Sequence, residues 1–501
     1  MNYKKILPII IIPTIISCND RYNEKNKPNI IFIMSDDLGW RDLSCYGSEF
    51  YETPNLDSLA SVGMRFTNAY AACPVSSPTR VSFQTGRYPA REHITDWIPG
   101  KYGYSNDMMK KICPVLPPLM VMDMPLERVT IAEAMKEGGY VTAHIGKWHC
   151  CHSDSTYYPE NQGYDYNIGG CSYGSPMGPN PYFVPYNNPR LPDGPEGEYL
   201  TDRLGDECIK IIRENKDKPF FINLCFHQVH IPLNAKPEKI EYFRRKAQRM
   251  GLDTMNVFID NPEYISQQPF PKEITNLRER IVQSDLVYAA MISHMDDNIG
   301  RIMAELKSLG IADNTIIMFM SDNGGVSTSE GSPTSNLPLR AGKGFCYEGG
   351  IREPMIVYWP GHEPVCHESD AVVTSTDFYP TILDLSGLPL RPENHLDGMS
   401  FKAALLEDKS YDRGDVFWHY PHYSNQGSRP AGAIRSGDYK LIENYDDNSL
   451  ELYNLKDDIG EQTNLADKEP DKANELRMKL HKWLESVDAQ YVIDNRDLEK
   501  Q

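Results

Sequence analysis

The stretch NIIFIMSDD (residues 29–37) decides the fold class, because an apolar run breaks off at two adjacent acids. An apolar run without polar alternation is typical of a strand that is buried on both faces of a parallel sheet. Four further runs have the same pattern and also read as strands. They are residues 140–149, 219–230, 314–325 and 354–361.

The segments between these runs have helical periodicity. Residues 130–139 end in a Gly-Gly stop, and residues 200–215 form a second helical pattern. The stretch 277–310 places five apolar side chains on one face: Met291, Met295, Ile299, Met303 and Leu306. Helices that alternate with buried strands predict an α/β fold, in which a mostly parallel sheet is sandwiched between helices.

The pattern of predicted elements changes after about residue 395. Short strand-like runs follow, separated by turn residues, and an amphipathic stretch at 470–489 closes the chain. The runs are residues 415–420, 431–445 and 449–455. We therefore expect a catalytic domain over residues 28–395. A smaller C-terminal subdomain over 396–490 should hold an antiparallel sheet and a helix.

The N-terminus carries a secretion signal. Two lysines precede an apolar stretch, and the segment ends in Ile15-Ile16-Ser17-Cys18, which resembles the bacterial lipoprotein box. We expect residues 1–18 to be a lipoprotein signal peptide, Cys18 to carry a lipid, and residues 19–27 to be a polar tether. This predicts a place in the cell envelope of a Gram-negative bacterium, periplasmic or at the outer membrane. The alternative is an ordinary secreted protein.

Charge and cysteine content exclude some functions. The net charge is −19 and there is no long basic run, so nucleic-acid binding is not expected. An acidic body repels a long polyanion, and any cationic site for an anionic substrate must be local. The 11 cysteines show no CxxC or zinc spacing, and no disulfide pair can be assigned.

Polar residues follow the predicted strands at the points where they end. In parallel sheets ligands gather at the carboxyl ends of the strands, so these residues should share one site. Asp36-Asp37 and Asp322-Asn323 offer only hard oxygen donors, which suit Ca²⁺ or Mg²⁺. The alternative is that an acid pair caps a helix, as we expect for Asp296-Asp297 inside its helical segment.

Cationic or titratable side chains stand at the same strand ends or in a Gly-rich loop. They are Lys147, His149, His230 and Lys343. Such groups suit a tetrahedral oxyanion, and a histidine can also act as a general acid. Each one alone is most often a structural or surface residue; the combination points to a site.

The segment CPVSSPTRVSFQTGR (residues 73–87) resembles the signature of the sulfatase family, Cys/Ser-x-Pro-x-Arg followed by Thr-Gly-Arg. The register selects Ser76, because Pro78 and Arg80 follow at the right spacing. Cys73 and Ser77 do not fit it. In this family the first residue is oxidised to formylglycine, and a serine there implies an anaerobic sulfatase-maturing enzyme. Thr79, in place of a common serine, is a mild departure.

The resemblance extends from about residue 28 to 485 and includes HIGKWH (144–149), SDNGG (321–325) and GKGFCYEGGIREP (342–354). It implies an alkaline-phosphatase-like fold. It also implies a Ca²⁺ held by Asp36, Asp37, Asp322, Asn323 and the modified Ser76. The positions that contact the aldehyde and the sulfate in the family are matched by Arg80, Lys147, His149, His230 and Lys343.

Three insertions resemble those of carbohydrate sulfatases close to the N-acetylgalactosamine and galactose branch: residues 91–105, 163–183 and 417–430. Their aromatic and polar side chains suit sugars. We expect a sulfated glycan as substrate, with a terminal galacto-configured sugar and a sulfate at position 4 rather than 6. The expected sugar contacts are His227, Asp96 and Trp97, with His419, His422 and Arg429 closing the pocket.

The sequence leaves two other functions open. One is a phosphatase or phosphodiesterase of the alkaline-phosphatase superfamily, which would use an unmodified serine and usually two zinc ions. The other is a lipoprotein that binds sulfated glycans without catalysis, if Ser76 is never converted. A formylglycine at residue 76 would separate both from the sulfatase.

Overall fold

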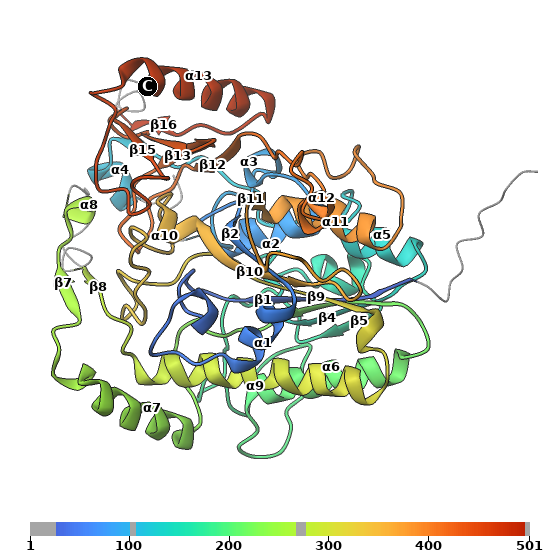
Figure 1. Cartoon of the computed structure of the whole chain (residues 1–501). Helices are drawn as coiled ribbons and strands as arrows, with labels where there is room; N and C mark the ends of the chain where they lie inside the picture. Colours follow the sequence, from blue (N-terminus) through green and yellow to red (C-terminus); the bar gives the residue numbers. More distant parts are fainter. Residues whose placement is uncertain (1–26, 101–106, 267–276, 496–501) are drawn as a thin grey trace, which may run out of the picture.

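The computed structural model describes residues 27–100, 107–266 and 277–495 (Figure 1). The expected signal peptide with Cys18, and the tether up to residue 26, lie outside the described residues and stay predictions. Within the described ranges, no helix has the length and apolar character needed to cross a membrane.

An eight-stranded sheet forms the centre of the molecule (Figure 1). Only β10 runs antiparallel to its neighbours; the other pairs are parallel. The strand order is β11 (Glu368–Thr374), β2 (Met64–Tyr70), β10 (Arg352–Tyr358), β9 (Thr315–Ser321), β1 (Asn29–Ser35), β6 (Phe220–Cys225), β4 (Val141–Gly146), β5 (Tyr166–Ile168). All five predicted runs form strands of this sheet.

Alternation along β1 shows how the sheet is covered. Ile31 and Ile33 face one hydrophobic core, while Ile30, Phe32 and Met34 face the other, because successive side chains point to opposite faces. The first core is closed by α1 (Pro54–Val62), α6 (Leu200–Asn215), α7 (Pro237–Met250) and α9 (Leu286–Ser308). The second is closed by α2 (Ser76–Thr85), α5 (Ile131–Glu137), α11 (Phe378–Leu385) and α12 (Lys402–Leu405). The predicted helix-covered α/β fold is confirmed.

The helix predicted over 277–310 is shorter at its start. It begins at Leu286, because the Asp285 side chain accepts hydrogen bonds from the backbone N–H groups of Val287 and Tyr288. Residues 278–280 instead form strand β8 (Arg278–Arg280), which pairs with β7 (Phe258–Asp260). Further along this helix, Asp296 accepts backbone hydrogen bonds from the first turn of α1, so this acid caps a helix.

The C-terminal part forms a four-stranded antiparallel sheet, as predicted. Its strands are β12 (Val416–Tyr420), β13 (Ala431–Ser436), β14 (Tyr439–Asn444) and β15 (Leu450–Asn454). Helix α13 (Pro470–Ser486) packs Leu476 and Leu480 against Ile434 of this sheet. Residues of α12 pack into the core of the large sheet, and the domain boundary at residue 395 stays a prediction.

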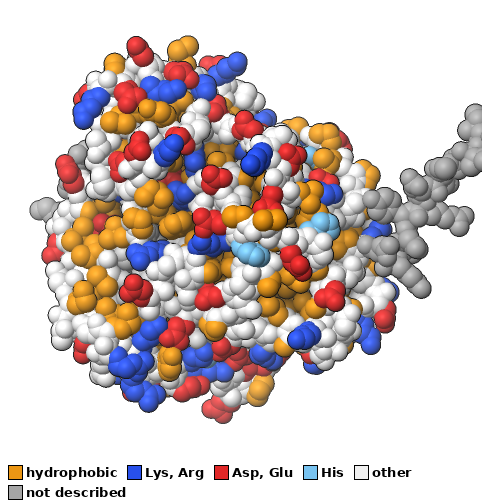
Figure 2. Space-filling model, viewed as in Figure 1, with side chains coloured by type: hydrophobic (Ala, Val, Ile, Leu, Met, Phe, Trp, Pro, Cys, Tyr) orange, Lys and Arg blue, Asp and Glu red, His pale blue; other side chains and the backbone are white. Residues whose placement is uncertain are grey.

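Short elements complete the described chain. They are η2 (Ser44–Tyr46), α3 (Pro89–Glu92), α4 (Asp107–Ile112), β3 (Val115–Leu116), η3 (Ser155–Tyr157), η4 (Pro159–Asn161), η5 (Leu252–Thr254), α8 (Glu263–Ser266), η6 (Ala312–Asn314), α10 (Glu348–Ile351), η7 (Ser375–Asp377) and β16 (Ile493–Asp494). On the face drawn in Figure 2, basic and acidic side chains are interspersed. Cationic groups that bind an anion must therefore gather locally.

Candidate active site

The two acid-bearing strand ends lie side by side. Strands β1 and β9 pair in parallel with Ser35 opposite Ser321, so the residues that follow them emerge at the same edge of the sheet. The backbone N–H of Asp37 donates to Oδ1 of Asp322 at 3.2 Å. Asp37 has a φ of 61°, a left-handed conformation that turns the chain sharply at the end of the strand.

Ser76 lies directly at these acids. It is the first residue of α2 and is 2% exposed. Its hydroxyl lies 3.1 Å from Oδ1 of Asn323 and 3.3 Å from Oδ1 of Asp36, and Nζ of Lys147 approaches it at 3.4 Å. Cys73 is buried in a separate hydrophobic cluster, with its thiol near the carbonyl of Thr95.

Each buried acid has its own basic partner. Nζ of Lys147 lies 2.7 Å from Oδ2 of Asp36, and Nζ of Lys343 lies 2.8 Å from Oδ2 of Asp37. The guanidinium of Arg80 binds Oδ2 of Asp322 at 2.8 Å and also donates to the carbonyl of Lys147. The acids and bases therefore come from five segments of the chain: the ends of β1, β4 and β9, helix α2, and the loop that carries Lys343.

The acids of this cluster titrate differently. Burial raises the pKa of Asp36 to about 8; Lys147 opposes the rise, and the carboxylates of Asp322 and Asp37 add to it. Burial acts in the same direction on Asp37, but the Lys343 ammonium beside it holds the pKa of that carboxyl below its usual range. The positive charge of Lys147 therefore only partly compensates the burial of Asp36.

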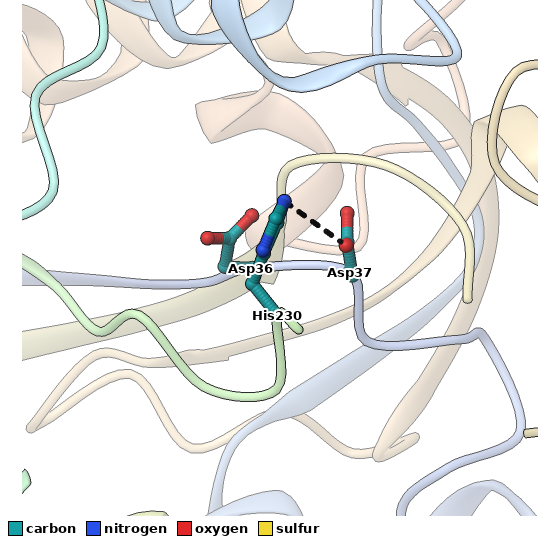
Figure 3. Close-up of side chains that lie close together, drawn as sticks. All are labelled: Asp36, Asp37 and His230. Carbon is teal, nitrogen blue, oxygen red and sulfur yellow. Dashed lines mark ion pairs between the residues drawn. The ribbon is translucent and has the colours of Figure 1, made fainter. Parts of the chain in front are cut away.

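The donor set fits a hard divalent cation. Ligand atoms of Asp36, Asp37 and His230 lie within 4.8 Å of one another, and Asp322 and Asn323 add further oxygens at the neighbouring strand end (Figure 3). Oxygens dominate this set, as Ca²⁺ requires. A bound cation would also add to the positive charge beside Asp36.

Each of two histidines at the site donates from one ring nitrogen to a backbone carbonyl, which leaves its other ring nitrogen as an acceptor. The ring of His149 donates from Nε2 to the carbonyl of Ile98 at 2.7 Å, since a carbonyl can only accept. His230 likewise donates from Nδ1 to the carbonyl of Ile231 at 2.5 Å, and its Nε2 lies 3.3 Å from Nζ of Lys343. Figure 3 shows Nε2 of His230 facing Asp37, at 3.6 Å.

Both rings are uncharged in this environment. Burial, reinforced by Lys147, lowers the pKa of His149 well below its ordinary value. Burial, reinforced by Lys343, lowers the pKa of His230 to about 3. A neutral imidazole with a free lone pair can accept a proton, so these two nitrogens are the candidate acid–base groups of the site.

Of the predicted sugar contacts, Asp96, Trp97 and His422 lie at the loop 95–98, whereas His419 has its partners within the C-terminal part of the chain. Asp96 is buried, Trp97 is partly exposed, and His422 binds the hydroxyl of Thr95 through Nε2 at 2.8 Å. His419 uses both ring nitrogens, one on the hydroxyl of Tyr445 and one on the carbonyl of Gln490.

Arg429 is also occupied elsewhere. Its guanidinium pairs with Asp446 and Asp447. Because His419 and Arg429 already have partners inside the C-terminal subdomain, we leave both out of the substrate site proposed below.

The sequence identified the insertion 163–183, but not how it contacts the histidine-bearing loop that follows β6. The hydroxyl of Tyr182 donates to the carbonyls of His227 and His230, at 2.6 and 2.7 Å, and so holds the loop that carries both histidines. Gly174 packs against the ring of His149, where a Cβ would lie 2.6 Å from Cε1. An aromatic-rich insertion was visible in the sequence, but not which of its residues reach the histidines.

Comparison with known proteins decides the family. The Sulfatase family matches residues 28–388, and the family described as N-sulphoglucosamine sulphohydrolase, C-terminal, matches residues 341–490. The chain belongs to the sulfatase family. It is a sulfuric ester hydrolase, as predicted, and its relatives include sulfatases that act on carbohydrates.

Three relatives illustrate the similarity. A sulfatase of Formosa agariphila is 31% identical over 98% of this chain and 95% of its own length. The human N-acetylgalactosamine-6-sulfatase is 31% identical over 78% of this chain and 68% of its own length. The crystal structure of Ps i-CgsB in complex with k-i-k-neocarrahexaose superposes with a TM-score of 0.71 at 27% identity, over 91% of this chain and 93% of that one.

Proposed function

We propose that this sulfatase removes sulfate esters from terminal galactose or N-acetylgalactosamine residues of glycans, with residue 76, converted to formylglycine, as the nucleophile. One observation carries the proposal. The Ser76 side chain is buried among Asp36, Asn323 and Lys147, at the meeting point of all strand ends that bear polar residues.

The modified residue and the metal would have different roles in the reaction. As an aldehyde hydrate, residue 76 would supply two hydroxyls, one to attack sulfur and one whose deprotonation releases the sulfate. A Ca²⁺ held by Asp36, Asp37, Asp322, Asn323 and residue 76 would supply charge to the sulfate oxygens. An unmodified serine lacks the second hydroxyl and would be trapped as a sulfate ester.

Lys147 and Lys343 bind the substrate anion in this scheme. Each ammonium group now binds one carboxylate, Asp36 or Asp37. With those carboxylates bound to a cation, both ammonium groups become available to the sulfate oxygens, where they stabilise negative charge in a site shielded from water. Arg80 stays on Asp322 and keeps the start of α2 in place.

The two histidines divide the proton transfers. Nδ1 of His149 is buried and has no hydrogen-bond partner among the described residues, so we assign it as the proton acceptor for residue 76. Nε2 of His230 lies next to Lys343 and is the group that we assign to the leaving sugar oxygen. It must gain a proton first, and a bound sulfate anion favours this because an opposite charge raises the pKa of an imidazole.

The sugar would lie against the insertion beside β6. A narrow hollow is lined there by His227 and by four aromatic side chains, Tyr173, Tyr182, Phe183 and Tyr186. Aromatic faces suit the apolar faces of sugars. The relatives named N-acetylgalactosamine-6-sulfatase support the galacto-configured sugar, although their name points to position 6 rather than the position 4 expected from the sequence.

Maturation and location complete the proposal. All residues from Ser76 to Arg80 are buried, so a sulfatase-maturing enzyme can reach them only before the chain folds. We also propose that the protein is exported and anchored through a lipid on Cys18. Labelling with a radioactive fatty acid tests this, since wild-type protein should take up label and Cys18→Ala should not.

A substrate screen tests the function. Protein co-expressed with an anaerobic maturase is assayed on 4- and 6-sulfated galactose and N-acetylgalactosamine, on the matching phosphate esters, and on intact sulfated polymer. We expect release of sulfate from the monosaccharides and from short oligosaccharides with a sulfated non-reducing end, well above release from polymer. Turnover of phosphate esters alone would establish the phosphatase, and binding without any turnover would establish a glycan-binding protein.

A further inference from the structure

The loop Thr95–Ile98 connects the nucleophile helix to the catalytic histidine. The backbone N–H of Ile98 donates to the hydroxyl of Ser77 at 3.0 Å, immediately after Ser76. The carbonyl of the same residue accepts the hydrogen bond from Nε2 of His149 at 2.7 Å. Ile98 therefore touches both the start of α2, through its N–H, and the ring that we assign as proton acceptor, through its carbonyl.

The same loop is bound from the other side by the C-terminal sheet. Oδ1 of Asp96 accepts hydrogen bonds from the backbone N–H of Trp97 at 2.9 Å and from the hydroxyl of Tyr420 at 3.0 Å. Tyr420 is the last residue of β12. His422, just beyond this strand, adds the bond to Thr95. The loop is thus fixed between two parts of the fold.

We propose that Asp96 and Tyr420 are positioning residues, through which the C-terminal sheet holds the Ile98 carbonyl and so fixes the orientation and tautomer of His149. The inference rests on the proposed function of the site. It replaces the earlier expectation that Asp96 binds the sugar.

The ring of His149 depends on this carbonyl. Within the described part of the chain, Ile98 supplies its only side-chain hydrogen bond, because Nδ1 has no partner. A carbonyl on Nε2 places the proton there and leaves the lone pair on Nδ1. If the carbonyl moves, the ring can turn or change tautomer, and Nδ1 no longer keeps its lone pair in a fixed direction.

The hydrogen bonds of Asp96 argue for a positioning part rather than for direct contact with a sugar. Asp96 is 4% exposed and Tyr420 is 1% exposed, and Oδ1 of Asp96 is already occupied by the N–H of Trp97 and the hydroxyl of Tyr420. These hydrogen bonds need only an acceptor oxygen, which an amide also provides. Burial also raises the pKa of this carboxyl to about 7.

Four variants separate positioning from sugar binding. Tyr420→Phe removes one hydroxyl and keeps the ring, and Asp96→Ala removes the acceptor. We expect kcat to fall on the order of 10-fold in each, with KM within about twofold of wild type. Asp96→Asn keeps an acceptor oxygen and should restore most of the activity. Tyr445→Phe is the matched control, since it removes a buried hydroxyl of the same subdomain that does not contact the loop.

The kinetic constants of these variants can contradict the inference in two ways. If Asp96→Ala raises KM and leaves kcat unchanged, Asp96 binds substrate and the inference is wrong. It is also wrong if Tyr420→Phe behaves like Tyr445→Phe. Inactivity of matured wild-type protein on every sulfate ester would instead refute the proposed function.

A crystal structure tests the geometry without activity. In Asp96→Ala, prepared without maturase, we expect the Ile98 carbonyl to leave His149 and the ring to change its orientation. An unchanged hydrogen bond between Ile98 and His149 would overturn the inference, whatever the enzyme hydrolyses.

Discussion

Two clusters of buried charged side chains differ in the partners that surround them. In the active-site cluster (Asp36, Asp37, Asp322, Arg80, Lys147 and Lys343), side chains meet at the ends of strands, next to bare histidine nitrogens. In the Lys440 cluster (Lys440, Glu348, Glu461 and Arg352), the ammonium of Lys440 lies 2.9 Å from carboxylates of both Glu348 and Glu461.

The surroundings of Glu348 show what the second cluster does. One of its oxygens binds Lys440, and the other accepts from the hydroxyl of Tyr70 and from Arg352. These residues tie the large sheet to β14 and α10. Burial raises a carboxyl pKa in both clusters, that of Asp36 to about 8 and that of Glu461 to about 7, so a raised pKa does not distinguish them. The active-site cluster differs in the histidine nitrogen Nδ1 of His149, which has no hydrogen-bond partner among the described residues and is where we expect substrate to act.

The largest effect is expected at residue 76. Ser76→Ala should lower kcat by at least about a thousandfold, because the nucleophile is lost, while the protein still folds. Cys73→Ala, made in the same signature segment, is the control and should keep near-normal activity. Sulfate release from matured protein of both variants measures this; loss of activity in Cys73→Ala alone would show that the other residue is the nucleophile.

The Lys440 cluster predicts a loss of stability. Lys440→Met leaves two buried carboxylates without their shared cation and should lower the free energy of unfolding by about 3–5 kcal/mol. Denaturant titration measures it. Lys147→Met is the matched variant, and Ca²⁺ should recover part of its loss. Equal recovery of Lys440→Met by Ca²⁺ would show that the two clusters do not differ as described.

Metal removal sharpens the same comparison. A chelator should inactivate the enzyme, and Ca²⁺ at 100 times its dissociation constant should stabilise the fold by about 2.7 kcal/mol. After chelation, Zn²⁺ should restore less of the activity than Ca²⁺ does, since the ligands are mostly oxygens. The thermal shift on adding Ca²⁺ measures this, and it should vanish in Asp322→Ala. A shift that survives in Asp322→Ala would place the cation elsewhere.

A further effect concerns pH and Asp96. The folded-state pKa of about 7 exceeds the ordinary value of 3.8, so the folded chain binds the proton more tightly than the unfolded one. Wild type should therefore lose stability relative to Asp96→Asn as pH rises from about 4 to 7, by up to about 1.4 kcal/mol for each unit of pKa shift. Unfolding titrations at pH 5 and 8 compare them; a constant difference would show that Asp96 is charged at both.

The sequence was sufficient for the sheet centre and for most of the site. Strands β1, β4, β6 and β9 are mostly apolar and almost wholly buried. Parallel strands bring their carboxyl ends together, so the polar residues that follow them could be assigned to one place. Strand β11 escaped notice because it lies at the sheet edge and is mostly exposed or half-buried, without a continuous apolar run.

Contacts between distant loops could not be predicted in the same way. No local pattern shows that Tyr182 reaches the carbonyls of His227 and His230, or that Tyr420 reaches Asp96. His419 and Arg429 looked like sugar ligands because their residue types suit sugars. In the folded chain His419 binds Tyr445 and Arg429 binds Asp446, and the sequence alone does not show these partners.

The central claim, that catalysis depends on conversion of Ser76, has one direct test. Protein is expressed with graded amounts of maturase, and the converted fraction is measured by mass spectrometry of the tryptic peptide from Phe66 to Arg80, which becomes two hydrogen atoms lighter. Sulfate release per molecule is measured on the same samples. We predict a rate that rises in proportion to the converted fraction and falls to zero without conversion. Full activity in unconverted protein would contradict the account.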